Sequence, residues 1–121
     1  MHIGELDRAE AFETMDGSTI RELAGAVSLP SRNQSLAEAS VAVGGATAEH
    51  YHHVAEELYF FTAGTGRLRV GDEERDVRAG QCIVIPPGAP HKLWNTGDEP
   101  VVLLCCCAPP YSHEDTVLTG G

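Results

Sequence analysis

Basic residues are scarce in this sequence, and long apolar runs are absent. The 121 residues include 8 Lys and Arg against 18 Asp and Glu, which gives a formal net charge of −10 at pH 7. Such a charge repels nucleic acid and anionic membranes, so we expect neither as a partner. No run approaches the roughly 20 apolar residues of a membrane span. The first residues, MHIGELDRAEAF, lack the basic-then-apolar profile of a secretory signal, so we expect a cytoplasmic protein.

The sequence has four cysteines, and their placement argues against a disulfide framework. The four cysteines are Cys82 and the run Cys105, Cys106 and Cys107. Consecutive strand residues point to opposite faces, so the run is poorly placed for pairing. The sequence contains no C-x-x-C pair, the spacing that is typical of structural zinc sites. We expect the three thiols of this run to pack as small buried apolar groups. The alternative is that Cys105 or Cys107 faces an internal site as a thiol ligand or redox group.

Turn signals recur at short intervals through most of the chain, whose length suits a single domain. Turn signals, most of them rich in glycine or proline, begin at residues 44, 64, 71, 79, 86 and 95. The β-prone segments between them are 57–63, 67–70, 75–78, 81–85, 91–94 and 101–108. Short strands at this spacing predict an all-β sandwich or barrel. We also expect a short helix over 7–12, a turn at 15–18, strands over 19–23 and 35–45, and a loop at 29–33.

Histidine and glutamate are concentrated in EHYHHVAEELYFFTAG, residues 49–64. A helix would accept this composition and would place His53 and Glu57 on one face. The preceding glycines and the aromatic run into a Gly-x-Gly turn favour strand, turn and strand instead. On a strand, His50 and His52 then share one face and His53 takes the other.

The returning strand has a corresponding inner phase. Glu57, Tyr59 and Phe61 share it, and Glu56 points outward. A pair of strand histidines with a nearby carboxylate is by itself a moderate signal for metal, because histidine has many other roles.

Two spacings make the signal specific. The first runs Gly44, five residues, His50, one, His52, four, Glu57, six, Gly64; the second runs Gly80, five residues, Pro86, one, Gly88, two, His91, three, Asn95. Together they resemble the two signature motifs of the cupin superfamily, in order, over residues 44–95. The resemblance implies an antiparallel cupin barrel, a jelly-roll-like double-stranded β-helix, with residues 35–108 as the barrel, 1–34 as an N-terminal arm and first strand, and 109–121 as a C-terminal tail.

The resemblance also implies a metal site. The ligand positions of the family fall on His50, His52, Glu57 and His91, whereas Glu49, His53 and Glu56 lie outside the set. Three imidazoles and one carboxylate suit a divalent transition metal (Fe, Mn, Ni, Zn, Co or Cu) better than Ca or Mg, so one such ion per chain is expected. Pro86 stiffens the approach to His91, and Asn95 is expected to serve the turn that follows.

Four protein ligands leave two positions open on an octahedral ion. The cupin resemblance implies dioxygenase, isomerase, decarboxylase or other lyase chemistry, or binding alone. We expect a metal-dependent enzyme acting on a small neutral or weakly acidic oxygenated compound. The alternative is a non-catalytic binding or sensing cupin. Tyr59 is a candidate catalytic proton donor, with a packed core aromatic as the alternative, and Leu93 and Trp94 are expected to add to an apolar pocket.

Several side chains keep two interpretations. Gln34, Glu38 and Ser40 share one phase that faces either the interior or solvent. Four arginines, Arg67, Arg69, Arg75 and Arg78, are expected to pair with nearby acids rather than enter the pocket, which disfavours a sugar phosphate as substrate.

The C-terminal residues Tyr111, His113 and Asp115 could cover the barrel mouth, but a solvated or exchanged tail is expected for a terminal segment. A homodimer is also expected, because compact cupins commonly pair and both faces of 101–108 are apolar.

Overall fold

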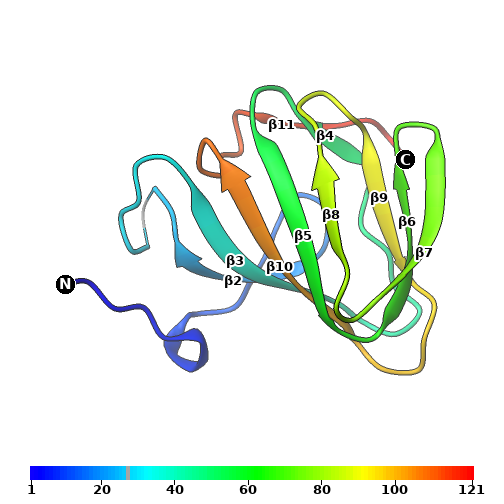
Figure 1. Cartoon of the computed structure of the whole chain (residues 1–121), viewed down its shortest axis with the longest axis horizontal. Helices are drawn as coiled ribbons and strands as arrows, with labels where there is room; N and C mark the ends of the chain where they lie inside the picture. The colour runs from blue at the N-terminus through cyan, green and yellow to red at the C-terminus, as the bar shows by residue number, and fades with distance from the viewer. Residues whose placement is uncertain (27) are drawn as a thin grey trace.

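The computed structural model describes residues 1–26 and 28–121, and within them almost all regular structure is β (Figure 1). The elements are η1 (Leu6–Arg8), β1 (Phe12–Glu13), β2 (Thr19–Ala24), β3 (Ser35–Val41), β4 (His50–His52), β5 (Glu56–Ala63), β6 (Thr65–Val70), β7 (Glu73–Arg78), β8 (Cys82–Ile85), β9 (His91–Asn95), β10 (Val101–Ala108) and β11 (Thr116–Leu118). The predicted all-β class is confirmed. None of the described helical residues forms a segment long and apolar enough to cross a membrane.

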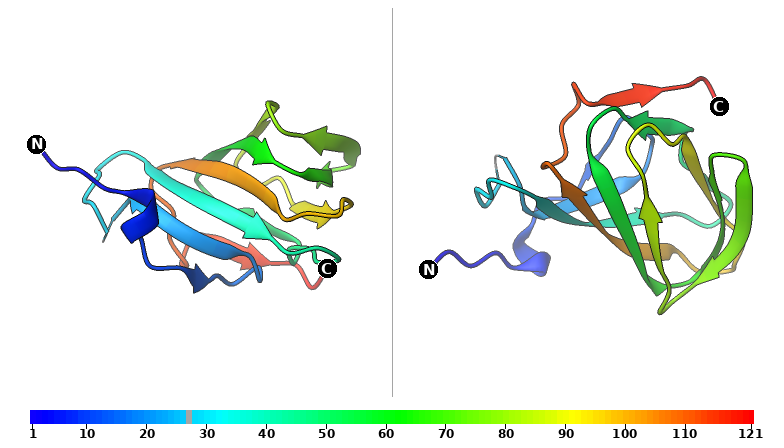
Figure 2. Two further views of the ribbon diagram at one scale, coloured as in Figure 1. Left: turned by 90° about the horizontal axis from the view of Figure 1, so that it is seen from below. Right: turned by 45° about the horizontal axis from the view of Figure 1, so that its top comes forward.

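The strands form two antiparallel sheets that pack face to face, as Figures 1 and 2 show from three directions. The first sheet has the order β1-β2-β3-β10-β5-β8, and the second has the order β11-β4-β9-β6-β7. Strict alternation places every second residue between the sheets; β5, for example, buries Glu57, Tyr59 and Phe61. Phe61, Leu93 and Leu103 are among the core side chains that are at most 2% exposed.

Gly64 lies where the chain passes from β5 in the first sheet to β6 in the second. Its φ of +82° lies in the left-handed region, which favours glycine. A Cβ at this position would lie 2.6 Å from the Pro100 carbonyl oxygen and 2.9 Å from Val101 Cα. The first motif therefore ends in glycine for two reasons, backbone conformation and lack of space.

Asn95 performs the turn role that the sequence predicts, and it also joins two elements. Its Oδ1 accepts a hydrogen bond from the Gly97 N–H at 2.9 Å, which organises the turn after β9. Its amide nitrogen donates to the carbonyl oxygens of Glu99 at 2.9 Å and Val41 at 3.0 Å. The last of these bonds ties the end of β3 to the end of β9.

Two local predictions are wrong at the N-terminal side. The expected helix over 7–12 is only the 3-10 turn η1, because Phe12 instead pairs with Ile20 and begins β1. The strand expected over 35–45 ends at Val41, since the Gly45 N–H bonds back to the Ala42 carbonyl in a turn. The expected turn at 15–18, the strand near 19–23 and the loop at 29–33 are present.

The expectation of a solvated tail is also wrong, because the tail forms a strand on the second sheet. Strand β11 pairs antiparallel with β4, with Thr116 opposite His52, and lies along the free side of β4 in Figure 2 (red). The Asp115 carboxylate accepts the backbone N–H groups of Val54 at 2.8 Å and Ala55 at 3.0 Å. The tail thereby covers a sheet edge that would otherwise present unpaired backbone groups.

Candidate metal centre

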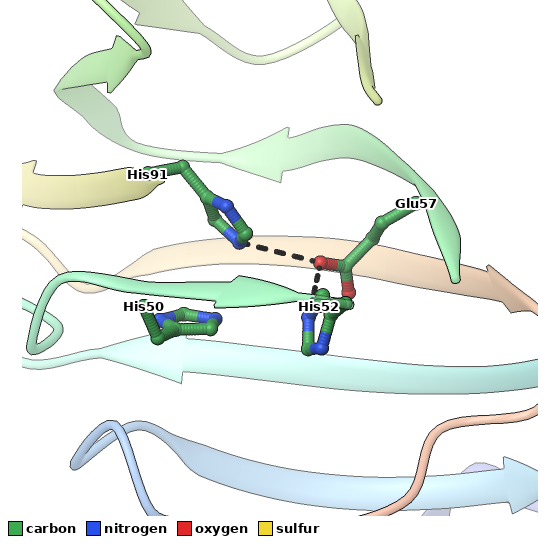
Figure 3. Close-up of side chains that lie close together, drawn as sticks. All are labelled: His50, His52, Glu57 and His91. Carbon is green, nitrogen blue, oxygen red and sulfur yellow. Dashed lines mark hydrogen bonds and ion pairs between the residues drawn. The ribbon is translucent and has the colours of Figure 1, made fainter. Parts of the chain in front are cut away.

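Four buried side chains from three strands meet between the two sheets (Figure 3). His50 and His52 come from β4, His91 comes from β9, and Glu57 comes from β5 of the opposite sheet. The register of β4 and β9 places His50 directly opposite His91. One ligand atom from each residue lies within 4.8 Å of the others. The predicted convergence is confirmed, and the described structure leaves His53 and Glu56 exposed, outside the cluster.

Hydrogen bonds at the outer ring nitrogens fix how the histidines face the site. His50 Nδ1 lies 2.9 Å from the Ala48 carbonyl oxygen, and His91 Nδ1 lies 3.0 Å from the Ala89 carbonyl oxygen. A carbonyl oxygen only accepts, so each Nδ1 carries the proton. Both imidazoles therefore direct an Nε2 lone pair inward in their neutral form, which is the form that binds metal.

His52 reaches the same state through a hydroxyl group on the tail. Its Nδ1 lies 3.1 Å from Thr116 Oγ1, and that hydroxyl donates its own proton to the Ser112 carbonyl oxygen at 2.9 Å. The Thr116 oxygen is consequently an acceptor for the His52 Nδ1–H. Three Nε2 atoms thus face one another and the carboxylate of Glu57.

This arrangement requires a positive charge at its centre. Oε1 of Glu57 lies 3.1 Å from His52 Nε2 and 3.5 Å from His91 Nε2, and His91 Nε2 is fully buried without a hydrogen-bond partner in the described chain. Lone pairs would otherwise oppose a carboxylate, so a proton or a cation must lie between them. Burial alone would raise the pKa of Glu57, but the hydrogen bond with His52 and the nearby His91 lower that pKa to about 2.

The donor set fits a transition-metal ion. Imidazole nitrogen binds such ions at about 2.0–2.1 Å, so opposed ligand atoms lie about 4.2 Å apart. The observed limit of 4.8 Å is about 0.6 Å above that spacing, so the four ligand atoms lie close to the separations that such an ion needs. Burial lowers the pKa of His50, and the neighbouring His91 lowers it further, which keeps the His50 ring neutral. His50, His52, Glu57 and His91 could therefore hold a metal ion.

The cluster opens into a cavity between the sheets. Ala37, Ala39 and Val41 of β3 line it, together with Leu93 of β9. The inward phase of β3 therefore consists of its odd-numbered residues. Gln34, Glu38 and Ser40 belong to the other phase and face away from the cavity, which decides between the two interpretations of these side chains.

Of the aromatic residues expected at the pocket, Tyr59 lines the cavity and Trp94 does not. Tyr59 lines the cavity, and its ring meets the His91 ring edge-on with centroids 5.8 Å apart. Its hydroxyl forms no hydrogen bond with a described residue, and burial raises its pKa, so this group keeps its proton. Trp94, expected in the pocket, faces away and lies beneath Arg69 and Lys92, 5.3 and 5.4 Å from its ring centroid.

The cysteine run alternates across the sheet. Cys105 and Cys107 line the cavity, and the Cys107 thiol donates to Glu57 Oε2 at 3.2 Å. Burial raises the pKa of both thiols, so they remain protonated in the metal-free protein. The alternative in which these cysteines face an internal site is confirmed, whereas a ligand or redox role stays a prediction.

The arginines remain outside the cavity, as expected. Arg67 pairs with Glu74 at 2.9 Å and Asp76 at 3.0 Å, and Arg75 pairs with Glu73 at 3.3 Å. Arg69 forms an ion pair with Glu49, which explains that half-buried carboxylate without a metal. Arg78 forms no ion pair with a described residue, so the expectation fails for it.

Asp16 and Thr116 were missed by the sequence reasoning, whereas Tyr111, named there as a possible cover of the barrel mouth, does line the cavity. Asp16 lies in the turn between β1 and β2, with Oδ2 3.7 Å from His50 Nε2. Thr116 orients His52, and the Tyr111 ring meets the His52 ring edge-on at 5.9 Å between centroids. Asp16 was recognised only as a turn residue. The tail residues have no local pattern that indicates their partners.

The fold and the site define a two-sheet antiparallel barrel with a buried His, His, Glu, His cluster that is competent for metal. Residues 37–107 match the family described as "Cupin domain", and the chain belongs to the cupin family. It is 46% identical over 112 residues to the uncharacterized protein MJ1618 of Methanocaldococcus jannaschii, covering 93% of this chain and 90% of that protein.

Solved structures agree on the fold. The oxalate decarboxylase of Lactobacillus farciminis, in a formate complex, superposes with a TM-score of 0.82 at 22% identity, over 95% of this chain and 35% of that one. The polyketide cyclase RemF of Streptomyces resistomycificus superposes with a TM-score of 0.78 at 23% identity, over 95% and 89%. Identities this low support the shared architecture alone.

Proposed function

We propose that this cupin holds one divalent transition-metal ion through His50, His52, Glu57 and His91 and acts on a small oxygenated organic compound in the adjoining cavity. One observation carries the proposal. Three inward Nε2 atoms and a carboxylate converge in a buried space, and His91 Nε2 has no other partner among the described residues. Such an ion, when bound, polarises an oxygen atom of the substrate.

The surrounding residues supply the other elements of an active site. The apolar walls from β3 and β9 exclude water and bind the carbon skeleton of a ligand. Tyr59 keeps its proton and has a free hydroxyl, so it serves as a donor to a bound oxygen atom rather than as a base. The Cys107 thiol holds the second oxygen of Glu57 and so orients that carboxylate.

A lyase, isomerase or dioxygenase reaction is consistent with these parts. Two proteins of the same fold are an oxalate decarboxylase and a polyketide cyclase, names that refer to oxygen-rich organic substrates. Fold alone does not choose among these reactions.

The second candidate function is binding or sensing without turnover. It is favoured by the state of the thiol and phenol groups of the cavity, since burial raises the pKa of Cys105, Cys107 and Tyr59. These three groups are therefore neutral and offer no ready base or nucleophile. In this version the metal orders the cavity and holds a ligand.

Metal analysis of matched variants tests the site. The untagged wild-type protein should contain about one transition-metal ion per chain, as a buried four-ligand set predicts. His91→Ala should lose most of it, whereas His53→Ala, an exposed histidine one residue past β4, should retain it. Equal metal content in the two variants would refute the ligand assignment.

Turnover separates the two functions. Iron- and manganese-loaded protein should be tested for oxygen uptake with diols and β-dicarbonyl compounds, and for non-oxidative conversion of the same panel. Oxygen uptake supports a dioxygenase, and product without uptake supports a lyase or isomerase. A metal-loaded protein that binds members of the panel and converts none supports the binding function.

A further inference from the structure

A turn outside the matched cupin residues brings a second carboxylate to the cavity. Asp16 lies between β1 and β2, and its side chain is only 14% exposed. The Asp16 carbonyl oxygen accepts the Ala48 N–H at 2.8 Å, and the Ala48 carbonyl oxygen in turn accepts the His50 Nδ1–H at 2.9 Å. The position of Asp16 is therefore tied, through the single residue Ala48, to a ligand of the proposed metal.

The two oxygens of this carboxylate have different surroundings. Oδ1 accepts three hydrogen bonds, from the Thr14 hydroxyl at 2.6 Å, the Ser18 hydroxyl at 2.6 Å and the Ser18 N–H at 2.9 Å. Oδ2 accepts none from the described residues and lies 3.7 Å from His50 Nε2. Three donors on one oxygen fix the orientation of the group, so Oδ2 is held as an open acceptor beside the site.

The charge of the cavity adds a second constraint. Asp16, Glu22 and Glu57 line it, and the described lining residues include no lysine or arginine. A dicarboxylate such as oxalate would bring two negative charges to a site where the carboxylates of Glu57 and Asp16 already offset the two charges of the proposed ion. An uncharged compound with a hydroxyl group would instead donate a hydrogen bond to Oδ2.

We propose that Asp16 determines which ligands this cavity accepts, by taking a hydrogen bond from the hydroxyl of an uncharged oxygenated compound at the metal position. The inference rests on the proposed function, because the ion supplies the other anchor for the ligand. Oδ2 of Asp16 lies 3.7 Å from Nε2 of His50, which is a proposed metal ligand. The hydroxyl of the bound compound therefore belongs on the carbon next to the one whose oxygen approaches the ion. An α-hydroxy ketone or a 1,2-diol has this arrangement, and oxalate does not.

The substitution Asp16→Asn changes the open acceptor Oδ2 and leaves the shape of the side chain unchanged. Its side-chain oxygen can keep the three donors of Thr14 and Ser18, while the open acceptor becomes an NH₂ donor. The matched control is Asp72→Asn, which removes the same charge from the exposed turn between β6 and β7. Cobalt-loaded wild-type and variant proteins are titrated with hydroxyacetone and, separately, with oxalate, followed by calorimetry and by the visible spectrum of the bound ion.

The wild-type protein and Asp72→Asn should bind hydroxyacetone more tightly than oxalate. In Asp16→Asn, hydroxyacetone binding should weaken by about tenfold or more, the usual effect of losing a charge-assisted hydrogen bond, and oxalate binding should strengthen. Cobalt content and thermal stability, measured on the same samples, should not change.

Each contrary result has a distinct meaning. An unchanged preference in Asp16→Asn at equal cobalt content overturns the role of Asp16 and leaves the proposed function intact. Loss of cobalt from this variant also overturns the role, because it makes Asp16 a metal ligand. Wild-type protein that binds hydroxyacetone no more tightly than oxalate overturns it as well. Wild-type protein that takes up no cobalt overturns both proposals.

Discussion

At the scale of single residues, the hydrogen-bond partner of Nδ1 determines which tautomer a buried histidine of this protein adopts. His50 and His91 each bond through Nδ1 to the carbonyl oxygen two residues earlier, that of Ala48 and Ala89 respectively. This local bond fixes the tautomer and leaves Nε2 for the site. His53, next to His52 in sequence, points to solvent because the strand alternates. Composition alone would have treated these histidines as equivalent.

The protonation of His50 should make the metal-free protein less stable below neutral pH. Burial lowers its folded-state pKa below the ordinary value of 6.5, so the unfolded chain binds a proton there more readily than the folded chain does. The contribution of His50 is therefore fully present above pH 6.5 and is lost as the pH falls below it, by at most about 1.4 kcal/mol per pH unit for one proton. Urea unfolding of the metal-free protein between pH 7.5 and pH 5.5 measures this slope.

Matched variants assign the slope to its residue. His50→Gln should flatten the pH dependence in this window, whereas His53→Gln should leave it unchanged, because His53 is exposed. Glu57 affects stability in a lower pH range. Its folded-state pKa of about 2 lies below the ordinary 4.5, so its contribution to the free energy of unfolding is lost only as the pH falls from 4.5 towards 2. An equal slope in His50→Gln and wild type would contradict the assignment.

At the scale of elements, the strands and four ligands could be predicted because their signals are local. Alternation on a strand groups His50 with His52, and the turn before Glu57 returns the chain to the same space. His91 is distant in sequence, and only the second motif, through its resemblance to the cupins, identified it. The segment predicted at 101–108 also has the bounds of strand β10.

What the sequence did not reveal depends on pairings between distant segments. Thr116 reaches His52 only because β11 pairs with β4, and Phe12 leaves a helical pattern because it pairs with Ile20. The facing of Glu38 likewise required the register of β3 between β2 and β10. No local pattern in the sequence encodes these registers, since each is chosen by the packing of the whole barrel.

The pairing of β11 with β4 predicts that Thr116→Val weakens metal binding. Valine keeps the shape of the side chain but removes the oxygen that accepts the His52 Nδ1–H. Metal affinity should fall about 10–100-fold, the usual effect of losing an outer partner of a ligating histidine. Competition with a chromophoric chelator gives the affinity.

Thr119→Val is the matched control for this experiment. Thr119 lies in the same tail, but its hydroxyl bonds to Glu49, outside the ligand set. This variant should bind metal as tightly as the wild-type protein. Equal affinities in all three proteins would show that the tail does not orient His52.

At the scale of the whole molecule, the outer face of the six-stranded sheet is unusually apolar. Leu36, Leu58, Phe60 and Val84 are 37%, 38%, 42% and 57% exposed. The registers make them neighbours, since Cys106 lies opposite both Leu36 and Leu58, and Leu58 lies opposite Val84. A contiguous apolar surface across four strands is typical of a site that another protein covers.

We propose that a second copy of the chain covers this face, so that the protein is a homodimer. Native mass spectrometry at micromolar concentration should show a dimer for the wild-type protein. Leu58→Glu should dissociate it, weakening association about tenfold or more, because it buries an unpaired charge at the interface centre. The control Val43→Glu, at a 55% exposed position in the turn after β3, should remain dimeric.

Each chain carries a formal charge of −10, so added salt should strengthen the dimer by screening repulsion between the copies. A wild-type protein that is monomeric at high and low salt would contradict the proposal and leave this apolar face without its expected partner.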